Sequence, residues 1–116
     1  MQDKTLEMTM LLDFYGELLT EKQRSCFSMH YNEDFSLGEI AEIMEISRQG
    51  ARDLIVRAEQ TLTKTEEKTG LIKRFSQEQA VFDKMDTQLK KLSTLCQGEA
   101  KQIAENLLTE LNSIKN

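Results

Sequence analysis

Apolar residues recur every three or four positions along most of the chain, which is the spacing of one face of an α-helix. Over residues 4–19 this spacing joins Leu6, Met10, Leu11, Phe14 and Leu18. We therefore expect a first helix that carries these five side chains on one apolar face. The chain has no proline and only five glycines, and these residues interrupt helices. Long helices are therefore the simplest interpretation of the whole sequence.

Hydroxyl residues mark the starts of the next helices. Thr20 is followed three residues later by Gln23, and Ser36 by Glu39, which is the pattern of a capping box. These signals predict a helix that ends in a turn at residues 31–34, with Cys26, Phe27 and His30 along one side. A short helix over residues 37–44 is predicted to follow.

A fourth helix is expected to begin after Ser47, whose hydroxyl can cap it, and to run to about Lys68. Gly70 is the stop signal. Beyond it, apolar residues again follow one narrow stripe, and they predict a long helix to Gly98 and a last helix from Glu99. The stripe consists of Leu71, Phe75, Phe82, Met85, Leu89, Leu92 and Cys96, then Ile103, Leu107, Leu111 and Ile114.

A stripe this narrow favours packing of helix against helix, within one chain or between two. We therefore divide the chain into residues 1–69, a compact domain, and residues 70–116, a helical extension for dimerisation or packing. The predicted fold class is all-α.

Residues 36–57 have the pattern of a helix-turn-helix. The small residue Ala41 lets two helices cross closely, Ile46 fills the turn between them, and Ala51 faces inward from the second helix. Glu45 stands where this turn normally has glycine. A left-handed backbone at Glu45 costs about 1 kcal/mol, and a slightly altered turn is the alternative.

The outward face of the second predicted helix holds the candidate nucleic-acid-binding residues. Ser47 and the free amides at the helix start could bind a phosphate, and arginine and glutamine side chains can reach base edges in a major groove. The alternative is a solvated face on a scaffold that has lost binding. The six candidates are Ser47, Arg48, Gln49, Arg52, Asp53 and Arg57.

Charge argues against strong, nonspecific binding to nucleic acid. The formal net charge is −5, and residues 20–64 hold six Lys and Arg against eight Asp and Glu, which makes this part −2. Most DNA-binding modules of this size are basic. Net acidity therefore favours a second hypothesis, in which the same helix docks a protein.

No sequence feature supports catalysis, metal binding or cofactor binding. His30 stands without a nearby cysteine pair, the acidic side chains at residues 39, 42 and 45 suit a solvated helix face, and no phosphate-binding glycine loop occurs. We expect no catalytic site, metal, cofactor or small-molecule substrate. Cys26 and Cys96 are expected to be free, buried thiols of a reducing cytoplasm. No apolar run approaches the ~20 residues that span a bilayer, and no signal peptide is expected.

The run from Leu19 to Leu62 resembles region 4 of bacterial sigma factors, which has no wing, and more specifically the YlxM family of helix-turn-helix proteins. The matching segments are Leu19–Gln23, Glu33–Asp34, Ser36–Leu37, Glu39–Glu42, Ser47–Gln49, Asp53, Arg57–Glu59, Glu66–Lys68 and Gly70–Leu71. Departures include Glu45 for glycine, Gly50 for a usual alanine, and Arg52 for a commonly aromatic or other residue. The C-terminal part matches only in helical character.

The resemblance implies a small, cytoplasmic bacterial protein without enzymatic activity. Genes of this family typically neighbour those of the signal recognition particle protein and its receptor, which implies a regulatory or accessory role in that targeting pathway. The implied partners are DNA or the particle's RNA or protein. A homodimer is expected from the stripe after Gly70, since a lone helix would leave it in water.

Overall fold

The computed structural model describes the backbone of residues 2–115 and the side chains of residues 4–115. Across these residues it contains helices and no strand, so the predicted all-α class is confirmed. Contacts divide the chain after Ile72 into two units, which are described separately below. The elements are α1 (Gln2–Tyr15), the 3-10 helix η1 (Gly16–Leu18), α2 (Glu21–Tyr31), α3 (Leu37–Met44), α4 (Arg48–Thr69), α5 (Leu71–Leu95) and α6 (Glu99–Lys115).

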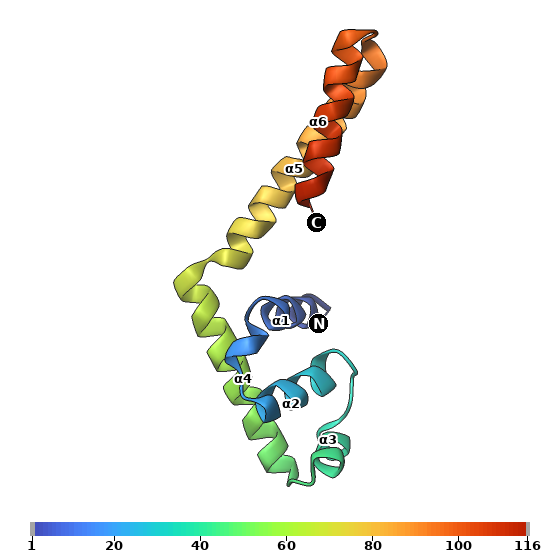
Figure 1. Cartoon of the computed structure of the whole chain (residues 1–116). Helices are drawn as coiled ribbons and strands as arrows, with labels where there is room; N and C mark the ends of the chain where they lie inside the picture. Colours follow the sequence, from blue (N-terminus) through green and yellow to red (C-terminus); the bar gives the residue numbers. More distant parts are fainter. Residues whose placement is uncertain (1, 116) are drawn as a thin grey trace. The chain divides into compact units, whose positions relative to one another are not determined.

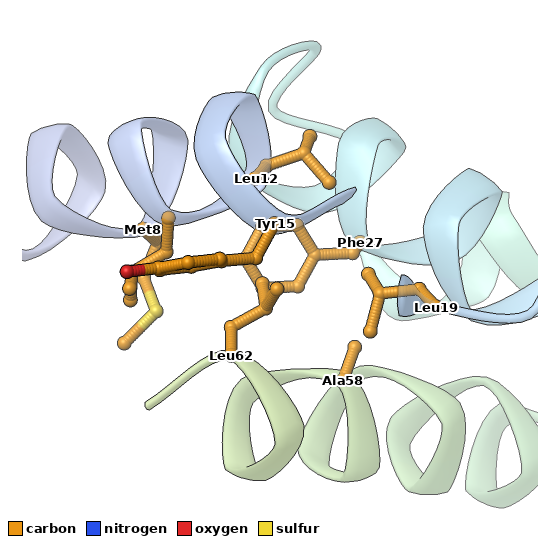
Figure 2. Packing of buried hydrophobic residues seen from close by; sticks show 8 residues of the cluster. Met8, Leu12, Tyr15, Leu19, Phe27, Ala58 and Leu62 are labelled. Carbon is orange, nitrogen blue, oxygen red and sulfur yellow. The ribbon is translucent and has the colours of Figure 1, made fainter. Parts of the chain in front are cut away.

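In the first unit, α1, α2 and α3 pack along α4 (Figure 1). Phe27 of α2 is fully buried between α1 and α4, where Leu12, Leu62 and Ala58 surround it (Figure 2). A second cluster joins α2, α3 and α4 through the buried side chains of Cys26, Ile40, Ala51 and Ile55. The first cluster thus contacts α4 through Ala58 and Leu62, and the second contacts it through Ala51 and Ile55.

Two tyrosines connect α1 and α2 to carboxylates of α4 by hydrogen bonds. The Tyr15 hydroxyl donates to Glu66 Oε1 at 2.6 Å, and the same oxygen accepts from the backbone N–H of Ile72. The Tyr31 hydroxyl donates to Glu59. Burial, together with the adjacent carboxylate, raises the pKa of each phenol above its ordinary value.

The predicted apolar face of the first helix is wrong. Leu6 and Leu18 are 63% and 61% exposed, and Phe14 is also exposed, whereas Met8, Leu12 and Tyr15 are buried. Of the five predicted residues only Leu11 is buried. Apolar residues occur nearly all round this helix, so periodicity allowed two faces. The first helix also ends at Tyr15, and the chain continues to Leu18 as a tighter 3-10 turn.

The predicted starts of α2, α3 and α4 and the predicted end of α4 are confirmed. Both capping boxes form, with Thr20 Oγ1 accepting from the Gln23 N–H and Ser36 Oγ accepting from the Glu39 N–H, each at 3.1 Å. Gly70 ends α4 with a φ of 63°, a left-handed conformation that glycine adopts without strain. These local interactions therefore set where α2 and α3 begin and where α4 ends.

Glu45 ends α3 in the left-handed conformation, with φ 58° and ψ 45°, so the altered-turn alternative is wrong. Its N–H reaches the carbonyls of Ala41 and Glu42, and the next N–H, of Ile46, donates to Ala41 O at 3.0 Å. Ile46 then packs against the second cluster. The sharp turn predicted between α3 and α4 therefore exists, although it lacks its usual glycine.

Glu45→Gly is expected to raise the free energy of unfolding by about 1 kcal/mol, because glycine removes the cost of a left-handed side-chain-bearing residue. Urea unfolding followed by circular dichroism measures the change. Glu42→Gly is the matched control, since it removes the same charge from the body of α3 and should cost about 0.5–1 kcal/mol. Equal effects of the two substitutions would contradict a strained turn at Glu45.

In the second unit, α5 and α6 run side by side (Figure 1), and Lys115 Nζ pairs with Asp83 Oδ1 at 2.9 Å. Among the described residues of this unit, Leu111 of the predicted stripe is buried, together with Asp86 and Ala104, which lie outside the stripe. Phe82, Leu89 and Cys96 of the stripe are half-buried, and α5 ends at Leu95 rather than Gly98. The remainder of the stripe is exposed, namely Leu71, Phe75, Met85, Leu92, Ile103, Leu107 and Ile114.

A carboxylate lies on the buried side of this helix pair. Asp86 Oδ2 accepts from Lys90 Nζ at 2.9 Å, and the charge of Lys115 also acts on it. Lys90 foremost holds the pKa of Asp86 below its ordinary value. Asp86 thus lies on the same side of α5 as the half-buried Phe82 and Leu89, whereas Met85 and Leu92 are exposed.

Both cysteines are free; Cys26 is buried as predicted, and burial raises the pKa of its thiol. Cys96 is only half-buried, so its predicted burial is wrong. None of the helices in the described part of the chain is long and apolar enough to cross a bilayer.

Candidate nucleic-acid interface

The start of α4 presents the six predicted binding residues to solvent. Ala51 and Ile55 face the core and fix the rotation of the helix, so Gln49, Asp53 and Arg57 lie on the outward side. At 3.6 residues per turn, residues 48, 49, 52 and 53 fall within an arc of about 140°, and residue 57 lies about 40° beyond it. Arg48 is on the core-facing edge of this arc, but it is exposed at the open start of the helix. We call this surface the α4 face; it consists of Ser47, Arg48, Gln49, Arg52, Asp53 and Arg57, all of which are exposed.

Ser47 caps the helix with its own hydroxyl. Its Oγ accepts from the backbone N–H of Gly50 at 2.9 Å. The amides of Arg48 and Gln49 stand at the first turn, where helix geometry offers them no intrahelical acceptor. The helix start can therefore still offer N–H groups to an anion, next to the positive end of the helix dipole.

Arg48 lies across the first turn of α3 at Gly38. A Cβ atom built at Gly38 would lie 3.1 Å from Arg48 Nη2 and 3.3 Å from Nε, so only glycine leaves this course open without adjustment. The guanidinium therefore lies against the first turn of α3. Gly38 is not among the predicted site residues; its one signal in the sequence is a glycine within the first turn of a short helix, where helix propensity disfavours it.

Gln49 and Asp53 are joined along the helix, because Gln49 Nε2 donates to Asp53 Oδ1 at 2.8 Å. Arg48, Arg52 and Arg57 form no ion pair with the carboxylates of residues 4–115. Their positive charges are thus available to an outside partner. Asp53 directly follows Arg52, and three further acidic side chains are exposed on α3 and at its end, namely Glu39, Glu42 and Glu45.

No alternative site chemistry emerges from the described residues. They include no group of three or more His, Cys, Asp or Glu side chains able to hold a metal ion. His30 is half-buried with its ring edge-on to Tyr31, 4.6 Å between centroids, which agrees with the predicted boundary position. The α4 face is the surface on which the interpretation of function depends.

Comparison with known proteins matches this chain to one family, over a range of residues that includes the α4 face. A family model, UPF0122, described as "Putative helix-turn-helix protein, YlxM / p13 like", matches residues 2–109. A UPF0122 protein of Listeria innocua is 48% identical over 95 residues, which are 82% of this chain and 86% of that protein. A UPF0122 protein of Thermoanaerobacter sp. is 54% identical over 86 residues, 74% of this chain and 71% of that protein. One of Caldanaerobacter subterraneus is 52% identical over 85 residues, 73% of each.

Proposed function

Since this chain belongs to the UPF0122 family of YlxM/p13-like helix-turn-helix proteins, we propose that it is a bacterial DNA-binding regulator. In this proposal it has no enzymatic activity and acts in the cytoplasm. The α4 face enters the major groove of duplex DNA, as the second helix of a helix-turn-helix does. The finer proposal, a role in the signal recognition particle pathway, rests on the gene neighbourhood typical of the family.

The observation that carries the proposal is the set of three exposed arginines at the start of a capped helix, none of which forms an ion pair within residues 4–115. Arg48 lies next to the turn, Arg52 follows one turn later on the same side, and Arg57 lies further along. Phosphate contacts by such side chains set the position on DNA, and base contacts set the sequence. A helix start with open amides adds a phosphate site beside Arg48.

A second candidate function is an adaptor that binds the signal recognition particle's RNA or protein without reading a DNA sequence. The net charge of −2 over residues 20–64 favours it, with six basic against eight acidic side chains. An acidic module meets the phosphate backbone with less attraction than most DNA-binding modules do. The α4 face would then dock a protein surface or folded RNA, and the net acidity favours the protein, because RNA carries the same phosphate charge.

The proposed assembly is a homodimer formed through the second unit. An open groove of about 650 Å³ lies between α5 and α6, lined by Met85, Leu89, Leu107, Leu111 and Ile114. Lys84 of α5 and Glu110 of α6 border the same groove. In a two-fold contact, Lys84 of one copy can face Glu110 of the other, which makes the surface complementary to itself in charge as well as apolar character.

Salt dependence of binding tests the proposed function. We expect the affinity for duplex DNA to fall steeply between 50 and 200 mM salt, with a slope of about −0.9 for each phosphate contacted. Fluorescence anisotropy with labelled duplexes taken from the protein's own genomic neighbourhood measures this slope. Binding that is absent at 50 mM salt would contradict DNA binding, and retention of a protein from nuclease-treated lysate would then favour the adaptor.

A further inference from the structure

The hydrogen bond between Gln49 and Asp53 fixes which way the glutamine amide is turned. The two side chains lie one helical turn apart on the α4 face, with Gln49 Nε2 at 2.8 Å from Asp53 Oδ1. An ionised carboxylate can only accept hydrogen bonds, so the amide nitrogen is the atom that must face Asp53. The carbonyl Oε1 of Gln49 is therefore turned away from Asp53.

From this orientation we infer that Asp53 is a positioning residue that makes Gln49 select a base with an exocyclic amine, adenine or cytosine. The inference rests on the proposed function. In the major groove, the exocyclic groups adenine N6 and cytosine N4 are donors, whereas guanine O6 and thymine O4 are acceptors; N7 is an acceptor in both purines. A carbonyl held outward attracts the first pair of bases and repels the second.

The charge of Asp53 supports a role in specificity. Asp53 is exposed between Arg52 and Arg57, on the surface that would meet the phosphate backbone. A negative charge there lowers the affinity for every DNA sequence equally, so it adds nothing to binding strength. Through Gln49 it penalises bases whose exocyclic group is an acceptor, which is how a repulsive element raises specificity.

Selection from a randomised duplex library tests the inference. The wild-type protein is expected to prefer adenine or cytosine over guanine at one position by roughly tenfold. Asp53→Asn can accept or donate, and therefore frees the Gln49 amide to turn over. We expect the preference of this variant to fall below about twofold, while its affinity for DNA as a whole stays equal or rises.

Glu67→Gln is the matched control, because it removes one negative charge from an exposed position further along α4. It should keep the wild-type preference. A second comparison separates positioning from direct contact: with Gln49→Ala already present, Asp53→Asn should change the preference no further. Circular dichroism reports the fold of each variant separately. A purely structural role of Asp53 would therefore appear in the circular dichroism spectrum and not as a change of base preference that depends on Gln49.

Two results would overturn the inference while leaving the proposed function intact. One is an unchanged base preference in Asp53→Asn. The other is a changed preference when Asp53→Asn is added to Gln49→Ala, which would mean that Asp53 meets the base itself. Failure of the wild-type protein to enrich any duplex would overturn the proposed function and the inference together.

Discussion

Replacing Arg48 and Arg52 together by alanine is expected to lower the affinity for duplex DNA roughly 100-fold, since each arginine contact contributes about 1–3 kcal/mol. Both side chains are exposed, and neither takes part in an ion pair with the carboxylates of residues 4–115. Their removal should therefore leave the folded state intact. Anisotropy titration at fixed salt measures the affinity, and circular dichroism checks the fold.

The control for this variant must remove the same charge from the same helix. Lys64→Ala with Lys68→Ala does so near the other end of α4, where both side chains are exposed. Each double variant takes the formal net charge from −5 to −7. If both double variants lose affinity equally, general electrostatics accounts for binding and the α4 face has no special part in it.

Replacing Leu107 and Ile114 by glutamate is expected to convert a dimer into a monomer. These side chains are 45% and 60% exposed in the single chain, so their replacement removes little that stabilises it. In a two-fold contact the double substitution places four carboxylates in an apolar interface. Removing the burial of each side chain, worth about 1.5–3 kcal/mol, should weaken association by at least about 100-fold.

Light scattering measures this change as a fall from twice 13.4 kDa to the mass of one chain. Leu95→Glu is the control, because Leu95 is 73% exposed on α5 yet does not line the groove. It should remain dimeric. A wild-type protein that is strictly monomeric would remove the proposed dimer, and a Leu95→Glu monomer would place the contact elsewhere.

The helix-turn-helix was predictable because its signals are local. Thr20, Ser36 and Ser47 each accept a hydrogen bond from an N–H three residues later, and Gly70 ends α4 in the conformation that its lack of a side chain permits. Such caps depend on neighbours in the chain alone. Only the helix bounds near Tyr15 and Leu95 differ from expectation.

The buried faces of α1, α5 and α6 were less predictable because tertiary partners choose among several apolar stripes. Tyr15 is drawn inward by its hydrogen bond to Glu66, 51 residues away. In the second unit, the buried side includes the charged Asp86 and the small Ala104, which no hydrophobic pattern would select. Periodicity predicts that a helix has an apolar side, but which of its residues become buried depends on the helix that packs against it.

The candidate site shows the same difference in predictability between a contact within one helix and a contact between two helices. Gln49 and Asp53 are four residues apart, so their contact follows from helix geometry. The course of Arg48 over Gly38 depends on how closely α3 and α4 cross, and no local signal specifies that distance.

The most direct test of the α4 face is the salt slope of DNA binding, measured side by side for the wild-type protein and Arg48→Ala/Arg52→Ala. If these arginines meet the DNA, the slope of the variant should be shallower by about one to two, one unit for each phosphate that an arginine no longer neutralises. Parallel slopes together with equal affinities of the two proteins would show that DNA meets the chain elsewhere, and would contradict the assignment of α4 as its binding surface.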